Sequence, residues 1–160
     1  MISFKKIRYK NFLSTGNIPI EVELDKSHTT LIVGSNGSGK STLLDALCYA
    51  LFNKPFRIIK KDQMVNTINN GDTIVEVEFE VGTNQYMIRR GIKPNLFEIY
   101  QNDKLINQDA SNIDYQKYLE QNIMKLNYRS FIQVVILGSS SYEPFMKMKP
   151  RYRREVVEEI

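Results

Sequence analysis

The sequence has one cysteine and one histidine among its 160 residues. Cys48 has no second cysteine, so an internal disulfide is excluded, and a lone thiol among apolar neighbours is expected to be packed and unreactive. His28 stands alone in a polar turn and receives no role. No apolar run approaches the ~20 residues of a membrane span, and the first ten residues alternate charge and apolarity, unlike a signal peptide.

No sign of charge dominates the composition. Lys and Arg number 22 against 18 Asp and Glu, a net charge of +4. This excess permits a polyanionic partner without requiring one. Hydrophobic residues make up 42% and charged residues 25%, as in globular proteins, and the length is sufficient for one domain with a core.

One nonapeptide carries the clearest chemistry. Gly34–Thr42, GSNGSGKST, fits G-x-x-x-x-G-K-S/T, the phosphate-binding loop. The apolar, β-branched run Thr30–Val33 before it predicts a buried strand, and Leu43–Phe52 after it predicts a helix. The alternative is a glycine-rich turn with a stray lysine, but this strand–loop–helix context favours the phosphate-binding loop.

Each residue type in the loop suits a bound nucleotide. The glycines let the backbone approach an anion closely, and successive N–H groups at a helix start form an anion nest. Lys40 is expected to reach the β- and γ-phosphates, and Ser41 to offer its hydroxyl to Mg²⁺. The predicted ATP and Mg²⁺ contacts are Ser35, Asn36, Gly37, Ser38, Gly39, Lys40, Ser41 and Thr42.

The remaining periodicity predicts an α/β fold: a mixed sheet around the helix that follows the phosphate-binding loop, with an added antiparallel β-meander. Two early strands are expected, with a bulge between Phe4 and Ile7, and Thr73–Val81 is the clearest strand, with glutamates on one face. Those glutamates are read as a solvated face that Arg89 and Arg90 can pair with, not as a metal site. The expected strands are Ile2–Tyr9, Ile18–Leu24, Thr73–Val81, Gln85–Arg90, Leu96–Tyr100, Lys104–Ile106 and Ser130–Gly138, and further helices are expected at Ile113–Tyr128 and from Arg151.

Five cations gather near the end of the sequence. They are Lys147, Lys149, Arg151, Arg153 and Arg154. One interpretation is a solvated helix start, and the other is a patch for a phosphate backbone or a partner. Cations at a helix N-terminus oppose the helix dipole, which argues against a purely local stabilising role.

Parts of a complete ATPase are missing from the sequence. We find no strand ending in Asp-Glu to supply a second acid for Mg²⁺, and no Leu-Ser-Gly-Gly motif. The sequence therefore predicts a nucleotide-binding site that lacks some of the residues needed to hydrolyse ATP.

Four segments resemble one family. The early loop, entered from Lys10-Asn11-Phe12, is similar to the ATPase heads of the structural-maintenance-of-chromosomes (SMC) superfamily, and most of all to its SbcC-type DNA repair branch. Leu51–Arg57, Ile88–Glu98 and Val135–Phe145 resemble the large subunits of bacteriophage recombination endonucleases.

The resemblance implies the N-terminal lobe of an ABC-type ATPase head. Residues 1–150 would form this half-head, and residues 151–160 would begin a coiled coil. The family's C-terminal half carries the missing acid and signature motif, and two heads enclose two ATP molecules. Closure of the heads drives DNA binding and gates an SbcD-type metal-dependent nuclease. The implied location is the cytoplasm, of the host if the protein is phage-encoded.

The sequence departs from the family pattern at two positions. Leu13 stands where cellular relatives often carry a nucleotide-contacting Arg, so that contact is absent or made by the backbone or by Ser14. Alignment on Phe131, Leu137 and Phe145 places Ser139 where relatives carry a Gln that helps bind Mg²⁺ and the attacking water, and Gln133 lies out of register. A weak or differently activated ATPase is the resulting hypothesis. Asn66 and Thr67 are further candidate nucleotide contacts.

Two other functions stay open. A stand-alone small-molecule kinase or GTPase is disfavoured by the missing second acid and by the absence of Asn-Lys-x-Asp. A non-hydrolysing DNA-binding module whose nucleotide switches its shape fits the chain taken alone.

Overall fold

The computed structural model describes residues 2–106, 112–136 and 144–159. The chain separates into two compact units between residues 109 and 110. Each unit is described by itself.

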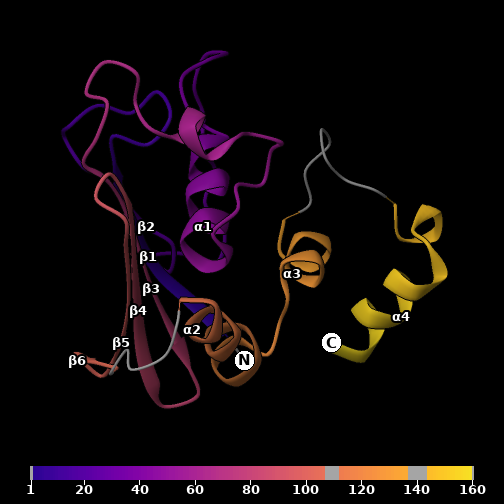
Figure 1. Ribbon diagram of the computed structural model, residues 1–160. Helices are drawn as coiled ribbons and strands as arrows, with labels where there is room; N and C mark the ends of the chain where they lie inside the picture. The colour runs from indigo at the N-terminus through magenta and orange to yellow at the C-terminus, as the bar shows by residue number, and fades with distance from the viewer. Residues whose placement is uncertain (1, 107–111, 137–143, 160) are drawn as a thin grey trace. The chain divides into compact units, whose positions relative to one another are not determined.

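The first unit is built on an antiparallel sheet of six strands in the order β2-β1-β3-β4-β5-β6 (Figure 1). The two early strands and the meander were predicted and are confirmed. The strands that the structure describes all pair antiparallel, so the sheet is not the mixed one that was expected. The strands are β1 (Ile2–Lys10), β2 (Ile20–Glu23), β3 (Thr73–Val81), β4 (Asn84–Ile92), β5 (Leu96–Gln101) and β6 (Lys104–Leu105).

Alternation along β3 sets the two faces of the sheet. Val75, Val77 and Phe79 are buried, and the glutamates between them lie on the other face. The register of β1 against β3 shifts between Phe4 and Lys6, which confirms the predicted bulge.

The two arginines of β4 have different partners. Arg89 Nε lies 3.0 Å from a carboxylate oxygen of Glu76, so its predicted pairing is confirmed. The predicted pairing of Arg90 with these glutamates is wrong, because Arg90 lies on the opposite, buried face. There it donates to the carbonyl of Ala50 and stacks 3.6 Å from the centroid of the Phe97 ring.

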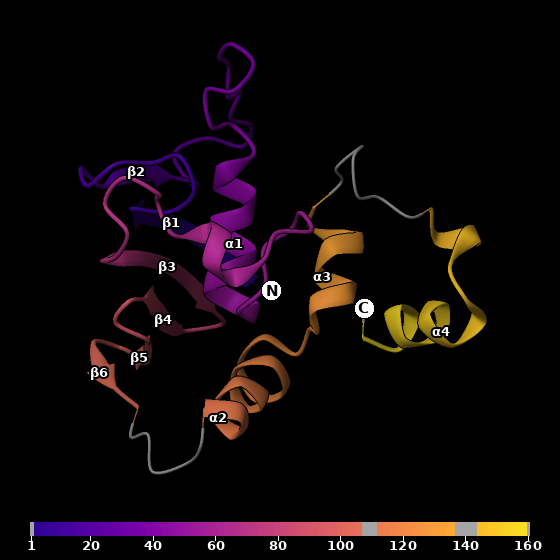
Figure 2. The ribbon, with the colours of Figure 1, turned by 45° about the horizontal axis from the view of Figure 1, so that its top comes forward.

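Helix α1 (Thr42–Phe52) packs on the apolar face of the sheet, as Figures 1 and 2 show. Its residues from Asp45 to Phe52 are all buried, and the Tyr49 ring stacks on Phe12 with 5.5 Å between centroids. The helix ends where Asn53 takes a left-handed conformation and donates its N–H to the carbonyl of Tyr49. The phosphate-binding loop is therefore anchored to the core through α1. A short 3₁₀ helix, η1 (Lys61–Met64), follows.

The predicted buried strand at Thr30–Val33 is wrong. Leu31 is 84% exposed and Val33 is 79% exposed, and no strand among the described residues pairs with this run. An apolar, β-branched run becomes a strand only where a neighbouring strand and a packing surface receive it. The described part of the chain provides neither here.

The second unit is helical. Its elements are α2 (Asn112–Tyr118), a π-helical continuation η2 (Leu119–Met124), α3 (Tyr128–Val134), a 3₁₀ turn η3 (Phe145–Lys147) and α4 (Pro150–Glu159). The predicted helix Ile113–Tyr128 ends early, because Lys125 takes a left-handed conformation. The guanidinium carbon of Arg129 on α3 lies 3.4 Å from the ring centroid of Tyr152 on α4.

The predicted strand at Ser130–Gly138 is also wrong. Its residues up to Val134 belong to α3, and Gly138 lies outside the described residues. Helix α3 begins because the Asn127 side chain caps it, accepting hydrogen bonds from the N–H groups of Arg129 and Ser130 at 2.9 Å each. Gln133 is therefore a helical residue and not part of a strand. Within the described ranges, no helix is long and apolar enough to cross a membrane.

Candidate nucleotide-binding site

The loop before α1 has the backbone of an anion cradle. Gly37 and Gly39 have φ angles of 84° and 89°, a region that favours glycine. The Nζ atom of Lys40 donates to the carbonyls of Gly34 and Ser35, both at 2.7 Å. Ser41 is exposed and its side chain makes no helix-capping hydrogen bond, so its hydroxyl is accessible.

A pocket of about 460 Å³ opens beside this loop. One wall is the loop and the start of α1, and the others come from the turn after β1 and the segment after α1. The lining residues are Leu13, Ser14, Asn36, Gly37, Gly39, Lys40, Ser41, Thr42, Arg57 and Ile59.

Asn66 holds the turn that brings Leu13 and Ser14 to the pocket. Its Nδ2 donates to the carbonyls of Thr15 at 2.9 Å and Leu13 at 3.3 Å. Its Oδ1 accepts from the N–H groups of Ile68 and Asn69, both at 3.0 Å. The buried Asn66 side chain thus ties the turn after β1 to the segment before β3.

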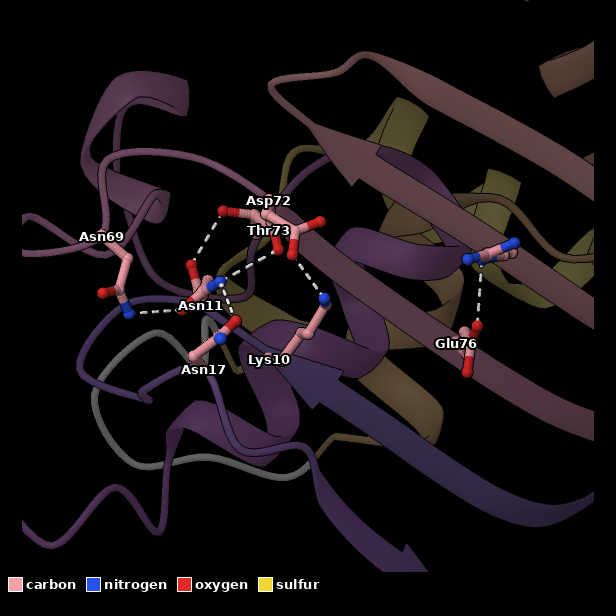
Figure 3. A network of polar contacts seen from close by, with 8 residues as sticks. Lys10, Asn11, Asn17, Asn69, Asp72, Thr73 and Glu76 are labelled. Carbon is pink, nitrogen blue, oxygen red and sulfur yellow. Dashed lines mark hydrogen bonds and ion pairs between the residues drawn. The ribbon is translucent and has the colours of Figure 1, made fainter.

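A second network, centred on Asn11, supports the same turn (Figure 3). The Asn11 side chain donates to Asn17 Oδ1 and to the carbonyl of Asp72, and it accepts from Asn69. Thr73 donates its hydroxyl to the Asn11 carbonyl at 2.8 Å. Asn11 itself has φ of 50°, a left-handed conformation that Asn tolerates better than most residues.

The sequence reasoning missed Arg57 and its partner Asp45. Asp45 lies in the first turn of α1 and is fully buried. Its Oδ1 accepts from the backbone N–H of Arg57 at 2.9 Å, and its Oδ2 lies 2.7 Å from Arg57 Nε and 2.5 Å from Arg57 Nη2. The available signal was the carboxylate itself, since an acid inside an apolar helix face needs a cationic partner.

The other titratable groups of α1 stay neutral near pH 7. Burial, with a smaller effect from the Asp45 carboxylate, raises the pKa of the Cys48 thiol to about 12. Burial also raises the pKa of Tyr49 to about 12. Neither is suited to act as a nucleophile or a base, and Cys48 is packed, as predicted.

The predicted contacts fall into three groups. Most of the loop residues line the pocket together with Ser14, while Ser35 and Ser38 belong to the loop without lining it. Asn66 and Thr67 do not line the pocket. The side-chain polar atoms of Asn66 are hydrogen-bonded within the turn and the segment before β3, and Thr67 is exposed. Ser139 lies outside the described residues.

The five predicted cations lie in or near η3 and α4 of the second unit. Lys147, Lys149, Arg151 and Arg154 are exposed, and Arg153 is half-buried. Exposure of this kind suits both interpretations of the patch.

The site fits the phosphates of a nucleotide and a hard cation. Left-handed glycines, accessible loop amides and a lysine suit phosphate oxygens. An uncommitted hydroxyl at Ser41 suits Mg²⁺, which takes oxygen ligands and keeps several waters.

The loop, the helix that follows it and the pocket beside them define a P-loop nucleotide-binding domain. Comparison with known families agrees: the chain belongs to the AAA domain family, whose profile matches residues 6–160.

Curated relatives refine this assignment. The chain is 44% identical to exonuclease subunit 2 of Escherichia phage RB69 and equally to that of Enterobacteria phage T4, in each case over all of this chain and 29% of the relative. It is 29% identical to the DNA double-strand break repair Rad50 ATPase of Thermoplasma volcanium, over 98% of this chain and 17% of the relative. The chain therefore spans less than a third of the length of these relatives, and the predicted homology to SbcC-type ATPases is confirmed.

Solved structures share the fold. A structure titled for the ATP-driven dimerisation and DNA-stimulated activation of SMC ATPases matches with a TM-score of 0.66 at 21% identity, over 98% of both chains. The Smc head domain of Pyrococcus furiosus, bound to the C-terminal domain of ScpA, matches with a TM-score of 0.68 at 20% identity, over 99% of this chain and 41% of that one. The predicted ATPase-head lobe is therefore confirmed as the fold class.

Proposed function

We propose that this chain is the ATP-binding half-head of a DNA repair and recombination ATPase. It is completed by a C-terminal half, dimerises with a second head on ATP, binds DNA and regulates an SbcD-type metal-dependent nuclease. Residues 1–150 form the half-head, and residues 151–160 begin a coiled-coil helix. A cytoplasmic location stays a prediction.

The observation that carries this proposal is the phosphate-binding loop on a lobe shared with ATPase heads. The loop amides and Lys40 hold the phosphates, and the Ser41 hydroxyl is a ligand for Mg²⁺. When bound, Mg²⁺ neutralises charge on the phosphate oxygens. The carbonyls of Gly34 and Ser35 use two of the three N–H donors of the Lys40 ammonium, which leaves one donor for a phosphate oxygen.

The catalytic set of this chain is proposed to be incomplete. Its sequence has no strand ending in Asp-Glu to supply a second acid for Mg²⁺, and no Leu-Ser-Gly-Gly motif. The second Mg²⁺-binding acid and the signature motif are accordingly assigned to the C-terminal half. This half-head grips ATP but does not turn it over alone.

The basic residues Lys147, Lys149, Arg151, Arg153 and Arg154 form the proposed surface for DNA or the nuclease. The 44% identity to two phage exonuclease subunits supports a nuclease partner. Contacts to the DNA backbone would make this binding fall steeply with salt.

The test is an ATPase and nuclease assay of the chain combined with the remainder of the ATPase and its nuclease subunit. Lys40→Ala is expected to abolish ATP turnover and the ATP dependence of cleavage, because the phosphates lose their cation. Lys61→Gln, which removes an exposed charge that does not line the pocket, is the matched control. Unchanged ATP turnover in Lys40→Ala, or transfer of phosphate to a metabolite, would contradict the proposal.

A further inference from the structure

The sequence contains two Asn-Gly pairs, Asn36–Gly37 in the phosphate-binding loop and Asn70–Gly71 in the turn before β3. An asparagine followed by glycine is open to an internal reaction, because glycine has no Cβ to keep the side-chain amide away from the next backbone nitrogen. Asparagine is also counted among the thermolabile residues of proteins. The structure holds the two pairs with different firmness.

Both reacting groups of the first pair are free. Asn36 is exposed, and its side-chain amide makes no hydrogen bond within the described ranges. The backbone N–H of Gly37 meets no acceptor in the part of the chain that the structure describes. One hydrogen bond, from the Ser38 N–H to the Ser35 carbonyl at 3.2 Å, spans the pair. The rotation that brings the amide of Asn36 onto the nitrogen of Gly37 is therefore weakly opposed.

The second pair is held from several sides. The side-chain oxygen of Asn70 accepts from Lys93 Nζ at 3.2 Å, and the Asn70 N–H donates to the Asn66 carbonyl at 2.8 Å. A Cβ built on Gly71 would lie 3.5 Å from the Lys93 carbonyl oxygen, whereas one built on Gly37 would meet nothing within 4 Å. The second pair is thus a control with the same residue types in the same chain.

We propose that Asn36 is a site of spontaneous deamidation, and that the reaction removes the capacity of the loop to bind a nucleotide. The backbone nitrogen of Gly37 gives its proton to solvent base and bonds to the side-chain carbonyl carbon of Asn36. The side-chain nitrogen takes up a proton and leaves as ammonia. Water then opens the cyclic imide at either carbonyl carbon, which yields aspartate or isoaspartate without any oxidant or reductant.

Either product disturbs an anion site. Both place a carboxylate in the wall of the pocket that Asn36 lines together with Lys40, and this charge repels the phosphates of a ligand. Isoaspartate also routes the backbone through the side-chain carbon, so it adds a methylene group between the loop amides that form the anion nest. This loss of binding rests on the proposed function, whereas the reaction itself does not.

A bound nucleotide should protect Asn36. Phosphate oxygens that accept from the loop amides, the Gly37 amide among them, engage the nitrogen that would attack the side chain. The loop is then chemically stable while it is loaded and open to modification while it is empty. Asn70 does not line the pocket, so a nucleotide should leave its rate of deamidation unchanged.

The test incubates the chain at mildly alkaline pH, with and without ATP and Mg²⁺. Peptide mass spectrometry and enzymatic methylation of isoaspartate measure the modified fraction at each asparagine. In the empty chain we expect Asn36 to react about tenfold faster than Asn70 or more, because the hydrogen bonds of Asn70 must break first. Saturating ATP should slow the reaction at Asn36 alone. Binding of a fluorescent ATP analogue should fall in step with the modified fraction at Asn36.

Two variants separate the added charge from other effects of ageing. Asn36→Asp carries the carboxylate from the start and should bind the analogue about tenfold more weakly than the wild type or worse. Asn70→Asp makes the same change outside the pocket, beside Lys93, and should bind like the wild type. Thermal unfolding should show that both variants are folded.

The outcomes distinguish this proposal from the proposed function. A fresh wild-type chain that binds no nucleotide overturns the proposed function and the predicted loss of binding, while the reaction at Asn36 is still measured. Deamidation of Asn36 no faster than that of Asn70 overturns the modification site, because the loop is then too rigid for the imide to form. Chains fully modified at Asn36 that bind the analogue as well as fresh ones overturn its effect on binding.

Discussion

Replacing Asn66 by alanine removes the side chain that fastens the turn after β1. The amide makes four hydrogen bonds and is 6% exposed. Ile68 and Asn69 are exposed, so their N–H groups turn to water at little cost. The Thr15 carbonyl belongs to a buried residue, and leaving it unpaired costs about 1–3 kcal/mol.

The expected loss of unfolding free energy is therefore about 2–3 kcal/mol, once the small cavity is included. For a chain of this length, 1 kcal/mol corresponds to about 2–4 °C in the melting temperature, so we expect a fall of about 5–10 °C. Nucleotide affinity should fall as well, because Leu13 and Ser14 lose their support at the pocket.

Thermal unfolding followed by circular dichroism measures the stability, and titration with a fluorescent ATP analogue measures the affinity. Thr67→Ala is the matched control: this neighbouring side chain is exposed, so the change should stay within about 0.5 kcal/mol. A fall of less than about 2 °C in the melting temperature of Asn66→Ala would refute the stabilising role of the Asn66 side chain. Lost affinity with unchanged stability would instead indicate direct contact between Asn66 and the nucleotide.

Two further predictions concern α1 and its loop. Cys48 should resist alkylation at pH 8.5 in the folded chain and react quickly in denaturant, because burial raises its pKa to about 12 from an ordinary 9.0. The contribution of the neutral thiol to the free energy of unfolding is complete below pH 9 and is lost as the pH rises toward 12. Rapid alkylation of the folded chain would contradict the packing of Cys48. Gly39→Ala should lower the free energy of unfolding by about 1–2 kcal/mol, because a φ of 89° is unfavourable for alanine. Denaturant unfolding measures this loss, and Gly16→Ala is the control, at a position with open space and no positive φ. Equal stability of the two variants would contradict the predicted backbone strain at Gly39.

The local pattern predicted the elements whose partners lie close in sequence. β3 alternates strictly, and its neighbours β4 and β5 follow through short turns. Helix α1 likewise buries a continuous apolar stretch against strands of the same unit. In these cases the periodicity and the packing surface agree, so the sequence was sufficient.

The two strand predictions that were wrong failed for different reasons. Thr30–Val33 has strand propensity without a strand to receive it among the described residues. Ser130–Val134 has the same kind of composition, but Asn127 caps a helix there, and an Asn just before an apolar run was a readable signal. Strand propensity was not sufficient at Thr30–Val33, where no described strand pairs with the run, and at Ser130–Val134 it was outweighed by the helix cap of Asn127.

The residues of the candidate site also differ in whether a local sequence pattern predicts them. The loop motif predicted Lys40 and Ser41, because their spacing is fixed by the backbone cradle. Arg57 could not be placed from a motif, since its position depends on an ion pair with Asp45 that spans twelve residues. The Asn66 amide likewise acts through carbonyls more than fifty residues away, which no local pattern predicts.

The two carbonyls that hold Lys40 prepare its charge for a ligand. The ammonium donates to Gly34 and Ser35 of the same loop, each at 2.7 Å, and an ammonium has three N–H donors, so one donor is left for a phosphate oxygen. A lysine side chain that is already ordered loses less conformational entropy on binding than one that moves freely. Any contact elsewhere in the protein that draws the carbonyls of Gly34 or Ser35 away from Lys40 would free this side chain and weaken nucleotide binding without touching the nucleotide.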